Sequence, residues 1–107
     1  MPECVQVVTT TDSREKADRL AWSAVESRLA ACAQVVGPIA STYWWQGQVE
    51  AATEWICILK TTALRGGELV AHLRREHTYE NPEIVAVPIV GGNPDYLSWI
   101  AQETAQP

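Results

Sequence analysis

The sequence has no phenylalanine, and its 8 Lys and Arg residues are outnumbered by 13 Asp and Glu, giving a net charge of -5. This balance opposes binding to nucleic acid or to anionic membranes, because both are reached through clustered basic side chains. No stretch has the ~20 consecutive apolar residues of a membrane span, and no basic segment followed by an apolar one opens the chain. We therefore expect a cytoplasmic protein with neither nucleic-acid nor membrane partners.

Cysteine is also scarce: Cys4, Cys32 and Cys57 are widely spaced and form no C-x-x-C pair. This excludes the common zinc and dithiol motifs and predicts reduced thiols. The chain also lacks a Ser-His-Asp order, a phosphate-binding glycine loop and an H-E-x-x-H motif. We therefore predict that the protein is not an enzyme.

What the chain does have is an apolar fraction of 47% over 107 residues, which predicts one folded domain spanning residues 1–107. Five of its residues are tryptophans. Such large amphipathic side chains are hard to bury in one small domain, so they favour self-association.

The first half of the chain reads as a strand, a helix and a hairpin. The β-branched run from Cys4 to Thr11 predicts a buried strand. Asp12, with Glu15 three residues later, is expected to cap a helix whose apolar stripe extends to Leu29 with only Arg28 polar.

Two long extended segments follow, from Cys32 to Trp45 and from Gln48 to Thr62, joined by the two-residue turn Gln46-Gly47. Gly37-Pro38 should divide the first segment into two sections. The second segment is apolar on both faces, which predicts that it is covered on both sides.

The remaining elements are a helix from Leu64, a strand from Ile84 to Val90 and a final helix opened by Asn93-Pro94. In the first of these helices we expect Arg65 to face water. The complete order is β-α-β-β-α-β plus a terminal helix, which predicts an α+β, ferredoxin-like split βαβ fold with two helices on one face of the sheet.

The hairpin arms are long for so small a domain, since about 14 residues at strand rise extend ~45 Å. A closed ring of identical subunits, in which each hairpin pairs with a neighbouring sheet, would cover the far end. Tyr43, Trp44 and Trp45 lie at that end and are the predicted contacts between subunits.

A polar cluster at the end of the second long helix is the first candidate site. His77 with Glu76, Glu80 and Glu83 offers one imidazole and three carboxylates, donors that suit Cu(II) or Zn(II). The alternative is that His77 satisfies the helix terminus while Tyr79 and Pro82 pack at a subunit boundary.

A second candidate site is a cleft around Lys60, Thr61 and Tyr79, because a lysine ending a buried strand among hydroxyls can hold a small anion or nucleotide. The alternative is a strand-end lysine that extends to solvent and pairs with a glutamate.

Five segments in register resemble the CutA divalent-cation tolerance family: RLAACAQVV (28–36), STYWWQGQVE (41–50), KTT (60–62), HTYENPEIVAVPI (77–89) and GNPDYLSWI (92–100). The resemblance covers nearly the whole chain. It implies a ferredoxin-like subunit, an interlocked homotrimer similar to the PII signalling proteins, and association with copper and other divalent cations.

In enteric members of that family, copper binding is attributed to a cysteine late in the first strand and a His-His pair. This chain has Thr9, Glu76 and His77 at those positions, so it retains one of the three. The predicted function is a non-enzymatic homotrimer that binds divalent metal, copper first, in metal tolerance. The alternative is a PII-like signalling module that binds a small anion or nucleotide between subunits.

Overall fold

The computed structural model describes residues 3–105. Over this range the elements are β1 (Cys4–Thr11), α1 (Arg14–Glu26), β2 (Cys32–Trp45), β3 (Gln48–Thr62), α2 (Ala63–Glu76), β4 (Ile84–Ile89) and α3 (Pro94–Glu103). The predicted order is confirmed. The strands form an antiparallel sheet in the order β2-β3-β1-β4, which is the ferredoxin-like α+β arrangement.

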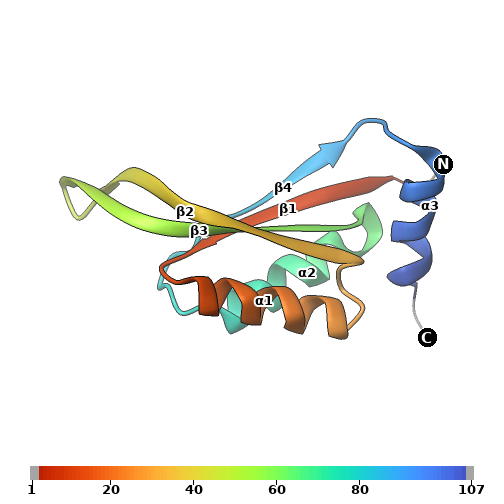
Figure 1. The fold of residues 1–107 in the computed structure, drawn as a ribbon, viewed down its shortest axis with the longest axis horizontal. Helices are drawn as coiled ribbons and strands as arrows, with labels where there is room; N and C mark the ends of the chain where they lie inside the picture. Colours follow the sequence, from red (N-terminus) through yellow and green to blue (C-terminus); the bar gives the residue numbers. More distant parts are fainter. Residues whose placement is uncertain (1–2, 106–107) are drawn as a thin grey trace.

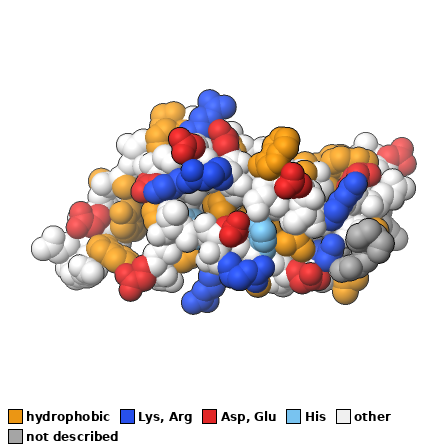
Figure 2. Space-filling model, turned by 90° about the horizontal axis from the view of Figure 1, so that it is seen from below, with side chains coloured by type: hydrophobic (Ala, Val, Ile, Leu, Met, Phe, Trp, Pro, Cys, Tyr) orange, Lys and Arg blue, Asp and Glu red, His pale blue; other side chains and the backbone are white. Residues whose placement is uncertain are grey.

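The layers are simple: α1 and α2 cover one face of the sheet, the β2–β3 hairpin projects beyond them at one end, and α3 lies at the other end (Figure 1). The outer surface of the helical layer carries interspersed acidic and basic side chains (Figure 2), several of them paired one turn apart along α1. No helix within residues 3–105 is long and apolar enough to cross a membrane.

The core lies between the sheet and α1 and α2. Val7 and Leu59 from the central strands are fully buried against Leu20, Leu69 and Leu73 from the helices. A second, smaller cluster joins α3 to the sheet through Cys4, Ala31, Leu97 and Ile100. Residues with helical spacing therefore bury one side of each helix, as the sequence predicted.

Cys4, Cys32 and Cys57 form no disulfide with one another. Burial raises the pKa of the Cys57 thiol to about 12, with Asp18 adding to the shift, so this side chain is a protonated, packed core residue. Cys32 instead lies beside the Tyr96 hydroxyl, with 3.3 Å between the sulfur and oxygen atoms.

The hairpin turns at Gln46 and Gly47, whose φ angles are 50° and 81°. Positive φ at both positions is the geometry of the type I′ turn, whose twist matches that of paired strands. The strand pairing shifts register between Val36 and Ile39, so the predicted two-section hairpin is confirmed. A Cβ at Gly37 would lie 2.5 Å from Cδ1 of Trp55, so this close approach requires glycine.

The start and end of α1 differ from the sequence prediction. Ser13, not Asp12, is the N-cap, because its side chain accepts a hydrogen bond from the backbone N–H of Lys16. Asp12 instead pairs with the Lys16 ammonium at 2.9 Å. The helix ends at Glu26, and Arg28 has a φ of 65°, so the apolar stripe does not continue as helix to Leu29.

Arg65 is also a correction, because it is 7% exposed rather than facing water. Its Nε donates to the backbone oxygen of Thr104 at 2.9 Å, and one Nη donates to the backbone oxygen of Arg28 at 3.4 Å. The other Nη pairs with Glu68 at 3.1 Å. The guanidinium can be buried because it donates to backbone oxygens beyond the ends of α1 and α3 and pairs with Glu68 on its own helix.

The sheet face opposite the helices remains open in the described chain. Val36, Val85 and Val87 on this face are each 46–48% exposed, and Ile56 and Ile58 are half-buried. The sequence predicted that β3 is covered on both sides, and one chain covers only the helical side. An apolar sheet face of this kind is typical of a surface that packs against another molecule.

Candidate functional site

His77 lies at the C-cap of α2, and both of its ring nitrogens have backbone partners. Nε2 donates to the carbonyl oxygen of Thr10 at 2.8 Å, while Nδ1 accepts from the N–H of Tyr79 at 3.0 Å. A carbonyl can only accept and an amide N–H can only donate, so this pattern requires the neutral ring with its proton on Nε2. His77 therefore ties the end of α2 and the following loop to β1.

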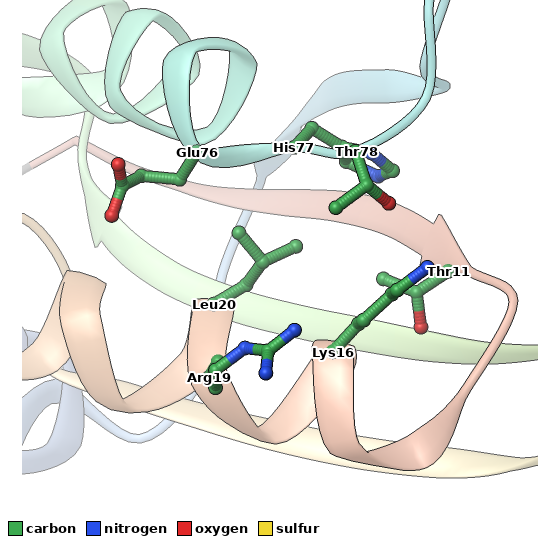
Figure 3. Close-up of a pocket in the computed structure, with 7 residues that line it drawn as sticks. All are labelled: Thr11, Lys16, Arg19, Leu20, Glu76, His77 and Thr78. Carbon is green, nitrogen blue, oxygen red and sulfur yellow. The ribbon is translucent and has the colours of Figure 1, made fainter.

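The four predicted metal ligands divide between two cavities. Glu76 and His77 line a small pocket of about 100 Å³ between α1 and the end of α2 (Figure 3). Glu80 and Glu83 line a larger cleft on the other side of the loop. Within residues 3–105, no group of three or more His, Cys, Asp or Glu side chains is arranged to hold a metal ion.

The small pocket has a basic wall. Lys16 and Arg19 project from α1 toward the segment that carries His77 and Thr78 (Figure 3). Each of these cations has an acidic neighbour one turn away, at 2.9 Å from Lys16 to Asp12 and at 3.0 Å from Arg19 to Glu15. The pocket therefore contains two cations that are each paired with a carboxylate, and one imidazole, that of His77, whose two nitrogens are both hydrogen-bonded to the backbone.

The larger cavity, which we call the acidic cleft, has a volume of about 540 Å³. It lies between the hairpin and the loop that follows α2. Its lining includes three carboxylates, those of Glu54, Glu80 and Glu83, and four aromatic side chains, those of Tyr43, Trp44, Trp45 and Tyr79. No lysine, arginine or histidine is among the lining residues.

Glu54 is the residue of this cleft that the sequence prediction missed. It precedes the apolar residues of β3 and was not among the predicted site residues, yet it is only 7% exposed. Its Oε2 accepts a hydrogen bond of 2.7 Å from the Tyr79 hydroxyl. Burial and this contact with Glu54 raise the pKa of the Tyr79 phenol well above its usual value, so the phenol stays protonated as a donor.

The second predicted set, Lys60, Thr61 and Tyr79, does not line a common cavity in one chain. Lys60 donates to the side-chain oxygen of Gln34 at 2.8 Å on the open face of the sheet. Thr61, the next residue of β3, points to the opposite face and is fully buried. Tyr79 bonds to Glu54, which is about 20 Å from Lys60 at strand rise.

The predicted trimer contacts lie near the tip of the hairpin, where Trp44 is 74% exposed and Tyr43 and Trp45 are each 42% exposed. They form one wall of the acidic cleft. A single chain therefore leaves these three large rings available to a neighbour or a ligand.

Comparisons with known proteins agree on one family. The family model described as CutA1 divalent ion tolerance protein matches residues 5–103. A divalent-cation tolerance protein CutA of Thermus thermophilus is 41% identical over 98 residues, covering 92% of this chain and 95% of the relative. A chloroplastic CutA 1 of rice is 38% identical over 102 residues, and these cover 95% of this chain but 58% of the rice protein.

A solved structure gives the same result: the crystal structure of CutA1 from Oryza sativa superposes with a TM-score of 0.94 at 37% sequence identity, covering 99% of this chain and 97% of that one. The agreement in sequence extends over nearly all of the described elements, including the hairpin and α3. This chain belongs to the CutA1 divalent ion tolerance protein family.

Proposed function

We propose that this protein is a non-enzymatic homotrimer that binds divalent cations, copper first, and acts in divalent-cation tolerance by sequestering or sensing the metal. Membership of the divalent ion tolerance family supports the metal class. The proposed trimer is supported by the open apolar sheet face with Val36, Val85 and Val87, which a single chain leaves exposed to water.

Trimerisation would use this face together with the hairpin. The molecule is 44 Å long and 25 Å wide, and the hairpin accounts for the projecting end (Figure 1). In a closed ring, Tyr43, Trp44 and Trp45 of each chain would pack on the next chain, and the unpaired edge of a sheet would be removed.

We place the metal at the subunit boundary, with His77 as the nitrogen donor and Glu76, Glu80 and Glu83 as candidate carboxylate donors. An imidazole with carboxylates favours copper in the Irving-Williams order. Ligation by His77 requires one ring nitrogen to release its backbone partner, Thr10 or Tyr79. The measured affinity would therefore include the free energy of breaking that hydrogen bond.

A calorimetric Cu(II) titration of metal-free protein tests this proposal, with the cysteines blocked so that thiol oxidation does not imitate binding. We expect submicromolar binding that His77→Ala abolishes. The matched control is His72→Ala, which removes the other histidine, a residue hydrogen-bonded to Ser23 between α1 and α2. Equal binding by His77→Ala and the unmodified protein would contradict the proposal.

The alternative function is a PII-like module that binds a small anion or nucleotide between subunits, with Lys60, Thr61 and Tyr79 as the predicted residues. One observation favours keeping it: the Lys60 amine lies on the open sheet face, which a trimer would bring against a neighbouring chain. Thermal stabilisation by nucleotides but not by divalent cations would select this alternative.

A cytoplasmic location also stays a prediction. The rice relative is named as chloroplastic, so family members are not confined to one compartment.

A further inference from the structure

Helix α3 packs separately from the main core of the subunit. Its buried side chains, Leu97 and Ile100, form a small cluster with Cys4 and Ala31, apart from the core between the sheet and α1 and α2. With 10 residues, α3 is too short to be stable as a helix without such contacts. Elements with few buried apolar contacts can open locally, at a free energy below that of global unfolding.

The surface that α3 covers follows from the strand register. Cys4 on β1 lies opposite Ile89 on β4, and further along the same pair of strands Val8 lies opposite Val85. Because side chains alternate along a strand, Cys4 and Ile89 point to the same side as Val85, which is the open face of the sheet. The helix therefore covers one end of that face, where the Cys4 thiol donates to the backbone oxygen of Leu97 at 3.8 Å.

The connection from β4 into α3 has the composition of a hinge. Residues 90–92 belong to no strand or helix, and Val90 is 99% exposed. Gly91 and Gly92 complete this segment, and a Cβ added at Gly91 would meet no atom within 4 Å. Glycine has the widest range of backbone angles, so the segment can change direction without moving the sheet.

The other end of α3 is held by two arginines from elsewhere in the chain. Arg65 on α2, which is 7% exposed, donates from Nε to the backbone oxygen of Thr104 at 2.9 Å. Arg28, which follows α1, pairs with the Glu103 carboxylate at 2.8 Å. A glycine segment at one end of a helix and side-chain contacts at the other end are the parts of a hinged lid.

We propose that α3 is a lid that opens as one unit about residues 90–92, while the sheet, α1 and α2 stay folded. The closed lid shields Cys4 and Ile89, and the open lid adds these two side chains to the apolar face. The lid thus sets how much of this face is available to another chain. The inference is independent of the proposed metal site, because α3 contains none of the proposed metal ligands.

Site-resolved thiol labelling tests the lid, since Cys4 lies under α3 and Cys57 is fully buried in the main core. The purified oligomer carries Cys32→Ser, so that no adduct forms beside Tyr96, and mass spectrometry follows N-ethylmaleimide labelling of the two remaining thiols. When opening and closing are fast, each labelling rate is proportional to the population of the open form. We expect Cys4 to be labelled at least about tenfold faster than Cys57, because local opening requires less free energy than global unfolding.

Two leucine truncations separate lid opening from global unfolding. Leu97→Ala removes a buried side chain from the lid, and we expect Cys4 labelling to become about thirtyfold faster or more, as for loss of a buried leucine. Leu73→Ala makes the same change in the main core. It should accelerate Cys57 labelling to a similar extent but change Cys4 labelling less than about twofold, because Leu73 stays packed when only the lid opens.

An exposed ion pair gives a second test that does not disturb either core. Glu103→Gln removes the partner of Arg28, and we expect Cys4 labelling to become about threefold faster, as for loss of an exposed ion pair. The matched control is Glu15→Gln, which removes the exposed pair with Arg19 on α1 and should leave Cys4 labelling within about twofold of the unmodified rate.

Three results would overturn the proposal. The first is an equal rate at Cys4 and Cys57, including no labelling of either thiol. The second is equal acceleration of both thiols by Leu73→Ala, which would mean that Cys4 is reached only through global unfolding. The third is a Cys4 rate that Glu103→Gln leaves unchanged, which would show that Cys4 becomes exposed without movement of α3.

Discussion

The Tyr79 hydroxyl donates a hydrogen bond to the buried Glu54 carboxylate of the hairpin. This contact makes the protonation state of Tyr79 important for the stability of the loop after α2. The folded state favours the protonated phenol, because burial disfavours the charged form and because the hydrogen bond to Glu54 and the charge of that carboxylate both oppose ionisation. His77, two residues earlier, holds the same loop to β1. Two adjacent polar contacts thus fix the segment that separates the two cavities.

The raised pKa of Tyr79 has a defined consequence for stability at alkaline pH. The folded state binds the phenolic proton more tightly than the unfolded state, so the free energy of unfolding should fall as pH rises above about 10, the unfolded value. Tyr79→Phe should make this decline less steep. Urea unfolding of both proteins between pH 8 and 11 measures it, with Tyr43→Phe as the control for loss of a cleft phenol. Identical slopes for Tyr79→Phe and the unmodified protein would contradict the assignment.

Several individual residues could not be placed from the sequence. Arg65 was predicted to face water because helical periodicity treats every charged residue as polar, yet its guanidinium reaches acceptors near residues 28 and 104. Glu54 was missed because its burial depends on a contact with Tyr79 from the loop after α2, which is distant in the sequence. A local pattern does not contain such long-range acceptors. The candidate residue His77 was found because a polar cluster beside a proline is a local signal.

At the scale of elements, the hairpin is the feature that local sequence specifies most strongly. Gln46 and Gly47 adopt positive φ, and every register pair from Ile39 to Trp45 follows from that turn. A side chain at Gly47 would meet no atom within 4 Å, so the requirement for glycine there comes from the backbone angle alone.

Gly47→Ala should therefore lower the free energy of unfolding by about 1 kcal/mol, because alanine is strained at a φ of 81°. The control is Gly67→Ala in α2, where added Cβ atoms also meet nothing and helical propensity should raise stability by up to about 1 kcal/mol. Guanidinium unfolding of the two variants checks the opposite signs. Stabilisation by both substitutions would show that the turn does not impose this geometry.

Element order was predictable, whereas element ends were less so. The cap of α1 was assigned to Asp12 from the Glu that follows three residues later, but Ser13 caps and Asp12 forms an ion pair. Both residue types favour that position, so the choice depends on the backbone path out of β1. The strand predicted to end at Val90 ends at Ile89, a difference within the usual uncertainty of element boundaries.

At the scale of the whole molecule, the open sheet face controls assembly in our proposal. Val85→Lys would place a charge on this face at a site that is 47% exposed in one chain, so the subunit should still fold. We expect sedimentation equilibrium to show three times the chain mass of 11.8 kDa for the unmodified protein and a shift toward one chain for Val85→Lys.

The control for this prediction is Trp22→Lys, because Trp22 is 73% exposed on the helical layer, away from the open face. It should sediment like the unmodified protein. A trimer that survives Val85→Lys, or an unmodified protein that sediments as one chain, would contradict the proposed interface.

The fold class could be predicted because the order of strands and helices allows few right-handed topologies. The candidate site could be predicted only in part, since the predicted metal ligands fall in two cavities. Which side chains share a cavity depends on the packing of α2 and its loop against the hairpin, and that packing joins residues such as Glu54 and Tyr79, which are distant in the chain.

The pairing of β1 has a consequence for synthesis of the chain. This strand is made first but lies inside the sheet, between β3 and β4. Its partners extend to Ile89, so the sheet cannot be completed until most of the chain has left the ribosome. The pairing of β2 with β3 is local and can form earlier, at microsecond rates. During translation, β1 can pair with β3 once the hairpin has emerged, but its other edge stays unpaired until β4 has followed.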